Sequence, residues 1–249
     1  MGGLIRNELY KALRLKKLYL LALVALTIEI VAALQGKFGG APPELRQPED
    51  QGFPILLFEH LPFLFVLMAT VFMADSWVEE YRSGAMKLSL LRPVSRIAFL
   101  NAKVISFFVC AAVLMGFTLV SAYVVGTIVL GWEGHTAVDE TELIAKSGAA
   151  TLLPVLGFGL LVLFIAVRTG NMVVTVGCSA GLLFASQLLE ASSELREYSI
   201  VYMMQVLPRN LILRYEGRQV ILNLAVIAAY IGVFYTGSVH LFRTKDVLA

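Results

Sequence analysis

The chain has 249 residues, of which 58% are hydrophobic and only 15% are charged, with a mean hydropathy of +0.79. A soluble domain carries roughly 25% charged residues, so the composition excludes an ordinary soluble fold. The formal net charge of +2 says little about partners, because the positions of the charges along the chain matter more than their sum. We expect no nucleic-acid partner.

Long apolar blocks recur along the chain. A membrane-spanning helix needs about 20 mostly apolar residues, with a range of about 17–25. Lipid offers no hydrogen-bond partner to an open backbone, so each block is predicted to be a helix. The six predicted spans are 18–34, 53–74, 104–130, 149–167, 171–189 and 220–242. The sequence therefore predicts an all-α integral membrane fold, with residues 1–249 forming a single transmembrane domain.

A charged leader precedes the first span. Ile5, Leu9 and Leu13 fall on one helical face, with basic residues away from its centre. This amphipathic pattern favours a helix that lies on the inner leaflet before turning into the membrane. The alternative is that the leader extends the first span into water.

The cation distribution predicts the orientation. If both termini are cytoplasmic, 13 of the 20 Lys and Arg residues lie inside and 7 lie outside, which satisfies the positive-inside rule. The predicted location is the cell (inner) membrane. Three outer loops are expected: residues 35–52, rich in Pro and Gly, residues 131–148, which are acidic, and residues 190–219. The third loop contains Tyr198–Leu207, an apolar run ended by Pro208 that suits an interfacial or re-entrant segment.

Three ionisable residues fall inside the predicted spans. Glu29 lies in the first span, and Glu59 and His60 lie near the outer end of the second, at similar depth. Charges at that depth are costly unless they are paired or face water. One hypothesis is a polar cluster that lines a translocation path, with Glu29 or Glu59 meeting His60. The alternative is that the spans end earlier and leave these groups at the wet interface.

The densest charge cluster, residues 75–96, separates the second and third spans. Its first part is predicted to be a helix leaving the second span, with Gly84 tolerated inside it at a cost of about 1 kcal/mol and Pro93 ending it. Mixed charges beside exposed apolar residues are typical of a docking element. The alternative is simple positive-inside anchoring.

This segment resembles the signature of the ATP-binding-cassette (ABC) transporter type-2 permease family, Glu-Tyr-x-x-Gly-Thr-x-Lys-x-Leu-Leu-x-x-Pro-x-Ser-Arg, followed seven residues later by Lys. The residues that match are Glu80, Tyr81, Gly84, Lys87, Leu90, Pro93, Ser95, Arg96 and Lys103. The chain departs from the signature at Ala85, where Thr is usual, and at Ser89, where Leu is usual. The leader also resembles the opening of that family, whereas the second half of the chain adds hydropathy only.

The resemblance implies an N-terminal interfacial elbow helix and a cytoplasmic coupling helix that fits a separate ATPase subunit. It also implies that two permease copies, identical or different, work with two ATPases in the bilayer. The residues that the resemblance assigns to coupling are Glu79, Glu80, Tyr81, Arg82, Gly84, Lys87, Pro93 and Arg96.

No phosphate-binding G-x-x-x-x-G-K-[ST] motif occurs in the chain, so ATP and Mg²⁺ are expected in the partner subunit. We expect no catalytic residues, cofactor or metal site in this chain. The expected function is export of a hydrophobic or amphipathic cargo, such as an antibiotic, a peptide or a lipid-linked molecule. The alternatives are a membrane sensor or anchor that uses the same fold without transport, and an ion-driven carrier. An intramembrane enzyme is disfavoured because neither H-E-x-x-H nor G-x-S-x-G is present.

Overall fold

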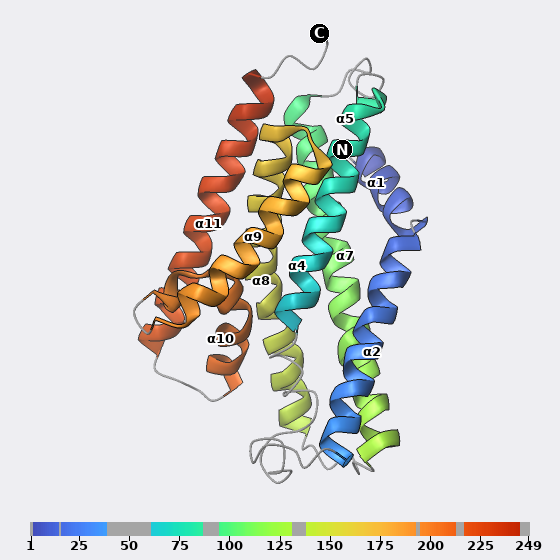
Figure 1. Ribbon diagram of the computed structural model, residues 1–249, viewed down its shortest axis with the longest axis vertical. Coiled ribbons are helices and arrows are strands. Elements are labelled where there is room, and N and C mark those ends of the chain that lie inside the picture. Colours follow the sequence, from blue (N-terminus) through green and yellow to red (C-terminus); the bar gives the residue numbers. More distant parts are fainter. Residues whose placement is uncertain are drawn as a thin grey trace.

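The chain is seen in a computed structural model that describes residues 2–14, 16–38, 61–86, 95–130, 138–192, 195–212 and 217–244. All regular secondary structure in these ranges is helical (Figure 1). Six helical segments are long and apolar enough to cross a membrane, which confirms the six-span prediction. They are Lys16–Gln35, Pro62–Arg82, Arg96–Val129, Ile144–Thr169, Met172–Glu190 and Gly217–Thr244.

The N-terminal segment forms a separate helix, as its amphipathic pattern predicts. Helix α1 (Gly2–Arg14) is followed by α2 (Lys16–Phe38), and both pack against the long helix α7 (Arg96–Val125). In Figure 1, α1 and the C-terminal end of α11 (Gly217–Thr244) lie at the same end of the bundle. We call this end the α1 end. The opposite end holds the C-terminus of α2 and the N-terminus of α8.

The second span continues into the charged segment without a break. Helix α4 (Leu61–Met73) passes into a π-helix, η3 (Ala74–Glu79), and then into α5 (Glu80–Arg82). Among the described residues the candidate span is Pro62–Arg82, so it ends later than the predicted residue 74, and the predicted start at residue 53 lies outside the described residues. Hydropathy alone ended the span at the first charge, whereas helical hydrogen bonding extends one turn and more beyond it.

Gly84 ends this helix instead of lying inside it, which corrects the sequence prediction. Its φ angle is +73°, in the left-handed region that residues with a side chain rarely adopt. The amide of Gly84 bonds to the carbonyl of Tyr81, and that of Ser83 bonds to Glu79, so the last turn is closed by its own backbone. This is the usual role of glycine just after a helix.

The third span begins at a capped residue. The hydroxyl of Ser95 accepts a hydrogen bond from the amide of Ala98, and α7 then runs to Val125 and into the π-helix η4 (Gly126–Leu130). Helix α8 (Val138–Thr169) starts well before the predicted fourth span, so residues 138–148 are helical rather than loop.

A very short turn joins the fourth and fifth spans, as predicted. Gly170 has φ of +60° and its amide bonds to the carbonyl of Ala166. The side chain of Asn171 then caps α9 (Met172–Glu190) by accepting from the amide of Val173 at 2.9 Å. One left-handed glycine and one capping asparagine are therefore enough to reverse the chain.

The segment before the last span forms η5 (Arg196–Tyr198) and α10 (Ile200–Ile212). Helix α10 passes through Pro208, which was predicted to end it. Its apolar side is buried against α8 and α11, so α10 is part of the packed bundle (Figure 1). Packing against two neighbours offsets the hydrogen bond that proline removes.

The protein core lies around α8, the most buried of the six candidate spans. Helices α4, α7, α10 and α11 surround it and contribute most of the buried apolar side chains. Helices α9 and α11 leave broad apolar faces exposed, which include Val173, Phe184, Leu188 and Val233. Such faces suit contact with lipid or with another membrane helix.

Candidate functional site at the α1 end

Four charged side chains close a ring between three helices. Lys103 on α7 donates to Glu8 at 3.1 Å and to Glu80 at 2.8 Å. Lys11 on α1 donates to the other oxygens of the same two carboxylates, at 3.0 Å and 2.9 Å. Lys103 also donates to the backbone carbonyl of Ser76 in η3. We call Glu8, Lys11, Glu80 and Lys103 the lysine–glutamate ring. Each of its carboxylates bridges both lysines.

The ring is largely removed from solvent. The side chain of Lys103 is 0% exposed, and it also lies over the ring of Phe99. A buried ammonium is stable only with good pairing, because desolvation costs several kcal/mol per ion. Partial burial alone lowers the pKa of Lys11, but hydrogen bonds and attraction from Glu80 and Glu8 outweigh it, so this pKa lies above its ordinary value of 10.5. The ring therefore ties α1, α5 and α7 together.

A second set of contacts ties the same region to the last helix. The guanidinium of Arg96, at the start of α7, donates to the carbonyls of Phe242 at 3.0 Å and Arg243 at 3.1 Å. A cation is favoured at a helix C-terminus, where the carbonyls lack helical partners. Trp77 of η3 is 2% exposed and packs against the rings of Phe99 and Phe242. The second, third and sixth candidate spans are thus connected at the α1 end.

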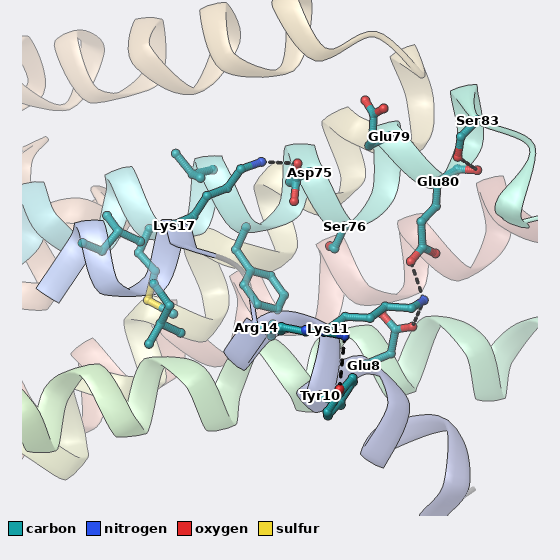
Figure 2. Close-up of a pocket in the computed structure, with 16 residues that line it drawn as sticks. Glu8, Tyr10, Lys11, Arg14, Lys17, Asp75, Ser76, Glu79, Glu80 and Ser83 are labelled. Carbon is teal, nitrogen blue, oxygen red and sulfur yellow. Dashed lines mark hydrogen bonds and ion pairs between the residues drawn. The ribbon is translucent and has the colours of Figure 1, made fainter.

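A cavity of about 580 Å³ lies between the α1–α2 corner and the α4–η3 helix (Figure 2). Lys17 of α2 forms an ion pair with Asp75 of η3 across it. Glu79, Lys11 and Arg14 also line the cavity. The π-helical turn contributes to this arrangement, because it holds one more residue than an α-turn and so re-aims the residues that follow. The apolar wall of the cavity is formed by Ala12, Leu18, Leu21, Met68, Val71 and Phe72.

The predicted coupling residues occupy different environments. Glu80 and Arg96 make the internal contacts described above, and Tyr81 is half-buried against the core. Glu79 and Arg82 are exposed. Gly84 forms the turn that ends the helix. Lys87 and Pro93 lie outside the described residues, so their place in the site stays a prediction.

Glu29, the first predicted path residue, is 3% exposed. Its Oε1 accepts a hydrogen bond from Ser121 Oγ at 2.9 Å, and Ala33, Ala122 and Val125 form a small apolar cluster of α2 and α7 nearby. The hydrogen-bond partner of Glu29 among the described residues thus lies in the third span, not in the second. Glu59 and His60 lie outside the described residues, so the predicted cluster with Glu29 stays a prediction.

Sequence reasoning missed Glu8 and Lys11 as members of the ring. Their spacing of three places both on one face of a helix, where such pairs interact, and this signal was available. Lys103 was recognised only as part of the family signature and as a cytoplasmic cation. No feature of the sequence joins positions 8 and 11 to positions 80 and 103, because tertiary packing brings them together.

The comparisons with known proteins identify a family and leave the activity open. A family model described as "Protein of unknown function (DUF2705)" matches residues 45–248. No curated protein matches the chain. Among the described residues, no group of three or more His, Cys, Asp or Glu side chains is placed to hold a metal ion.

Proposed function

The chain belongs to the DUF2705 family, and we propose that it is the transmembrane permease subunit of an ATP-driven exporter. In this proposal the α1 end faces the cytoplasm and docks onto a separate ATPase subunit, which binds ATP and Mg²⁺. The cargo is hydrophobic or amphipathic, such as an antibiotic, a peptide or a lipid-linked molecule. It moves out of the cytoplasm or the inner leaflet.

One observation carries the proposal: the second span runs as one helical rod to Arg82, and the lysine–glutamate ring joins that rod to α1 and α7. The signature residues Lys87 and Pro93 follow this rod directly in the sequence. A displacement of the segment after Arg82 would therefore move the second and third spans together. An element that passes motion from a soluble motor into a membrane bundle needs this kind of rigid connection.

The contacts divide the signature into two groups. Glu80, Arg96 and Lys103 hold helices of this chain together, and replacing them disturbs the fold as well as any docking. Arg82 is exposed at the tip of the rod and has no ion-pair partner within the described residues. Arg82 is therefore the residue we assign to contact with the ATPase.

The docking experiment co-expresses this chain with lone ABC ATPase subunits from the same genome and measures the amount of each that co-purifies. Arg82→Glu is expected to reduce co-purification at least fivefold, because it replaces a docking cation with an anion. Arg218→Glu, an exposed arginine at the N-terminus of α11, is the matched control and should leave co-purification unchanged. Equal yields for both variants would remove Arg82 from the interface, and an ATPase that never binds would remove the permease assignment.

Transport is tested separately in vesicles that hold both proteins. Cargoes of the three proposed classes are screened for stimulated ATP hydrolysis and for ATP-dependent movement across the membrane. A permease gives both signals with at least one cargo. If the ATPase docks and hydrolyses ATP but no cargo moves, the sensor alternative replaces the exporter.

A second permease copy is proposed at the exposed face of α9. Gly177 and Gly181 lie one turn apart on this helix with open space beside both, a spacing that allows two membrane helices to approach closely. Cys178 is exposed next to them and offers a probe. Mild oxidation in the membrane is expected to cross-link two copies through Cys178, and Gly181→Leu should abolish the cross-linked dimer. Gly116→Leu, at an open glycine of α7, serves as the control.

A further inference from the structure

Glu29 on α2 is a buried acid that the proposed function does not use. It lies six positions before Gln35, the last residue of the first candidate span, so about 9 Å of helix separates it from that end of the span. Glu29 is only 3% exposed. A charge at this depth is costly unless a cation or several hydrogen-bond donors compensate it.

No cation of the described residues lies beside Glu29. The main neighbours of α2 are α1, α4, α7 and η4. Apart from Glu29, the stretches of chain nearest to it carry no charged residue. They are residues 22–36 of α2, 61–73 of α4, and 114–130 of α7 and η4.

The nearest charges along α2 are far from Glu29. Lys37 is exposed and follows it by eight positions, which is about 12 Å of helix. The charged residues of α1 precede Lys16, which is itself thirteen positions or roughly 20 Å from Glu29. In the stretches beside Glu29 the other titratable group is Tyr123, which packs against the main core, whereas Glu29 lies by the small cluster of α2 and α7.

The described residues also supply few donors to this carboxyl group. Ser121 Oγ lies 2.9 Å from Glu29 Oε1, and Oε2 has no hydrogen-bond partner among the described residues. An ionised carboxylate has about four acceptor sites, and the carboxylates that stay ionised when buried accept two or three hydrogen bonds. A neutral carboxyl group loses much less when one of its oxygens is left without a partner.

The surroundings of Ser121 point the same way. Its hydroxyl oxygen also lies 2.8 Å from the carbonyl of Phe117 and 3.2 Å from that of Thr118. A serine hydroxyl has one proton, and inside a helix it commonly donates to the carbonyl four residues earlier. The distance between Ser121 and Glu29 fits either direction of the hydrogen bond between them. A protonated Glu29 reverses that bond and completes a chain in which Glu29 donates to Ser121 and Ser121 donates to Phe117.

We propose that Glu29 and Ser121 form a proton-binding site within the membrane, and that the bound proton holds α2 against α7. Release of the proton leaves a carboxylate that needs water. Ala33 and Ala122, which lie beside the site on the two helices, are both 0% exposed. Water therefore reaches the carboxylate only when α2 and α7 separate there. This site goes beyond the proposed function and does not depend on an ATPase partner.

Infrared spectroscopy of the purified chain tests for the proton directly, because a protonated carboxyl group has a C=O stretching band that a carboxylate lacks. At neutral pH, Glu29→Gln should lose a component of this band. Glu142→Gln, at an exposed acid of α8, is the matched control and should retain it. Ser121→Ala should keep the component and move it to higher wavenumber, because the carboxyl group then loses its acceptor. Glutamine is uncharged and offers Ser121 an N–H donor, so Glu29→Gln is expected to fold.

The pH dependence of stability gives a second readout of the same proton. An unfolded chain releases the proton of a glutamate above about pH 4.3, whereas the fold retains it at Glu29. The folded state then binds one proton more, so the stability of the unmodified chain falls relative to that of Glu29→Gln as the pH rises. The ratio of the two folding constants should change about tenfold per pH unit between about pH 5 and 7.

Thiol labelling tests whether the proton holds the two helices together. Ala122→Cys is introduced into a chain whose Cys110 and Cys178 are replaced by alanine. A small water-soluble reagent should label it about tenfold faster once the pH exceeds the value at which the infrared component disappears, because local opening exposes the site. The same chain with Glu29→Gln corrects for the higher reactivity of thiolates at alkaline pH. Ala111→Cys, equally buried on α7 but in the main core, should stay unlabelled.

Three results overturn the proposal. An infrared band that is identical in the unmodified chain and in Glu29→Gln, with a constant ratio of folding constants, shows an ionised Glu29 and favours the predicted meeting with His60. A component that persists to the alkaline limit of the stable fold makes Glu29 a permanently neutral packing group. Labelling of Ala122→Cys that follows pH equally with and without Glu29→Gln removes the link between the proton and the contact of α2 with α7.

Discussion

At the scale of single residues, the most consequential side chain is Lys103. It is fully buried, and its ammonium is satisfied by Glu8, Glu80 and the carbonyl of Ser76. Charged groups of this kind are costly to desolvate, so the contribution of each member depends on the others being present. The half-exposed Lys11 makes the same two contacts under much stronger solvent screening.

Lys103→Met is expected to destabilise the fold by about 3–5 kcal/mol, because it leaves two poorly solvated carboxylates with one cation. Lys11→Met should cost at most about 1 kcal/mol, because surface ion pairs are weak. Thermal unfolding in detergent compares the two. Adding Glu80→Gln to Lys103→Met should recover part of the loss, since the Glu8–Lys11 pair then stands alone. Equal losses for the two lysine variants would contradict a buried ring.

The raised pKa of Lys11 has a direct pH consequence. A lysine whose folded pKa exceeds its unfolded value adds stability that is fully present below the unfolded pKa, about 10.4. That stability is lost as the pH rises through the folded pKa. The difference in melting temperature between the unmodified chain and Lys11→Met should therefore shrink as the pH is raised from 9 to above the folded pKa of Lys11. A difference that stays constant over this range would rule out the ion pairs as its source.

At the scale of elements, the left-handed turn at Gly84 defines where the rod of the second span stops. Gly84→Asn should be tolerated, because asparagine enters this conformation more readily than other residues with a side chain. Gly84→Val should cost roughly 1–2 kcal/mol, since its side chain clashes with the backbone there. The difference in stability between the two variants measures backbone strain alone, because the space around Gly84 is open and neither side chain meets a neighbour there. Denaturant unfolding gives the free energy of unfolding of each variant. Equal values would show that the turn leaves the left-handed conformation without cost.

Hydropathy predicts the existence of the spans better than their ends. A lipid environment enforces helix formation wherever the chain is apolar, so all six spans are recovered. The ends of the helices depend on hydrogen bonds and packing contacts, which a hydropathy average does not include. Helix α8 begins at Val138, before its apolar run, and α10 continues through Pro208 because α8 and α11 hold it.

The candidate site is predictable only in part for a related reason. The signature identified Glu80, Arg96 and Lys103, and the resemblance assigned Glu80 and Arg96 to coupling with a separate ATPase. In the structure Glu80 pairs with Lys11 and Lys103, Lys103 also pairs with Glu8, and Arg96 donates to backbone carbonyls at the end of α11. The cavity needs the corner between α1 and α2 to face η3, and no spacing in the sequence encodes that approach.

At the scale of the whole molecule, several polar and aromatic contacts of the described residues gather at the α1 end. They are the lysine–glutamate ring, the aromatic contacts of Trp77 and the bonds of Arg96 to the end of α11 (Figure 1). At the other end, α2 and α7 meet through small and β-branched residues around Glu29.

The orientation of this asymmetric bundle is open to direct measurement. Single cysteines are placed at Ser83, at the α1 end, and at Ser192, after α9, in a chain whose Cys110 and Cys178 are replaced by alanine. The cation distribution predicts that a membrane-impermeant thiol reagent labels Ser192→Cys on intact cells and Ser83→Cys only after the membrane is opened. The reverse pattern would place the α1 end outside. The cytoplasmic docking of an ATPase at Arg82 would then be physically impossible, whatever the signature resembles.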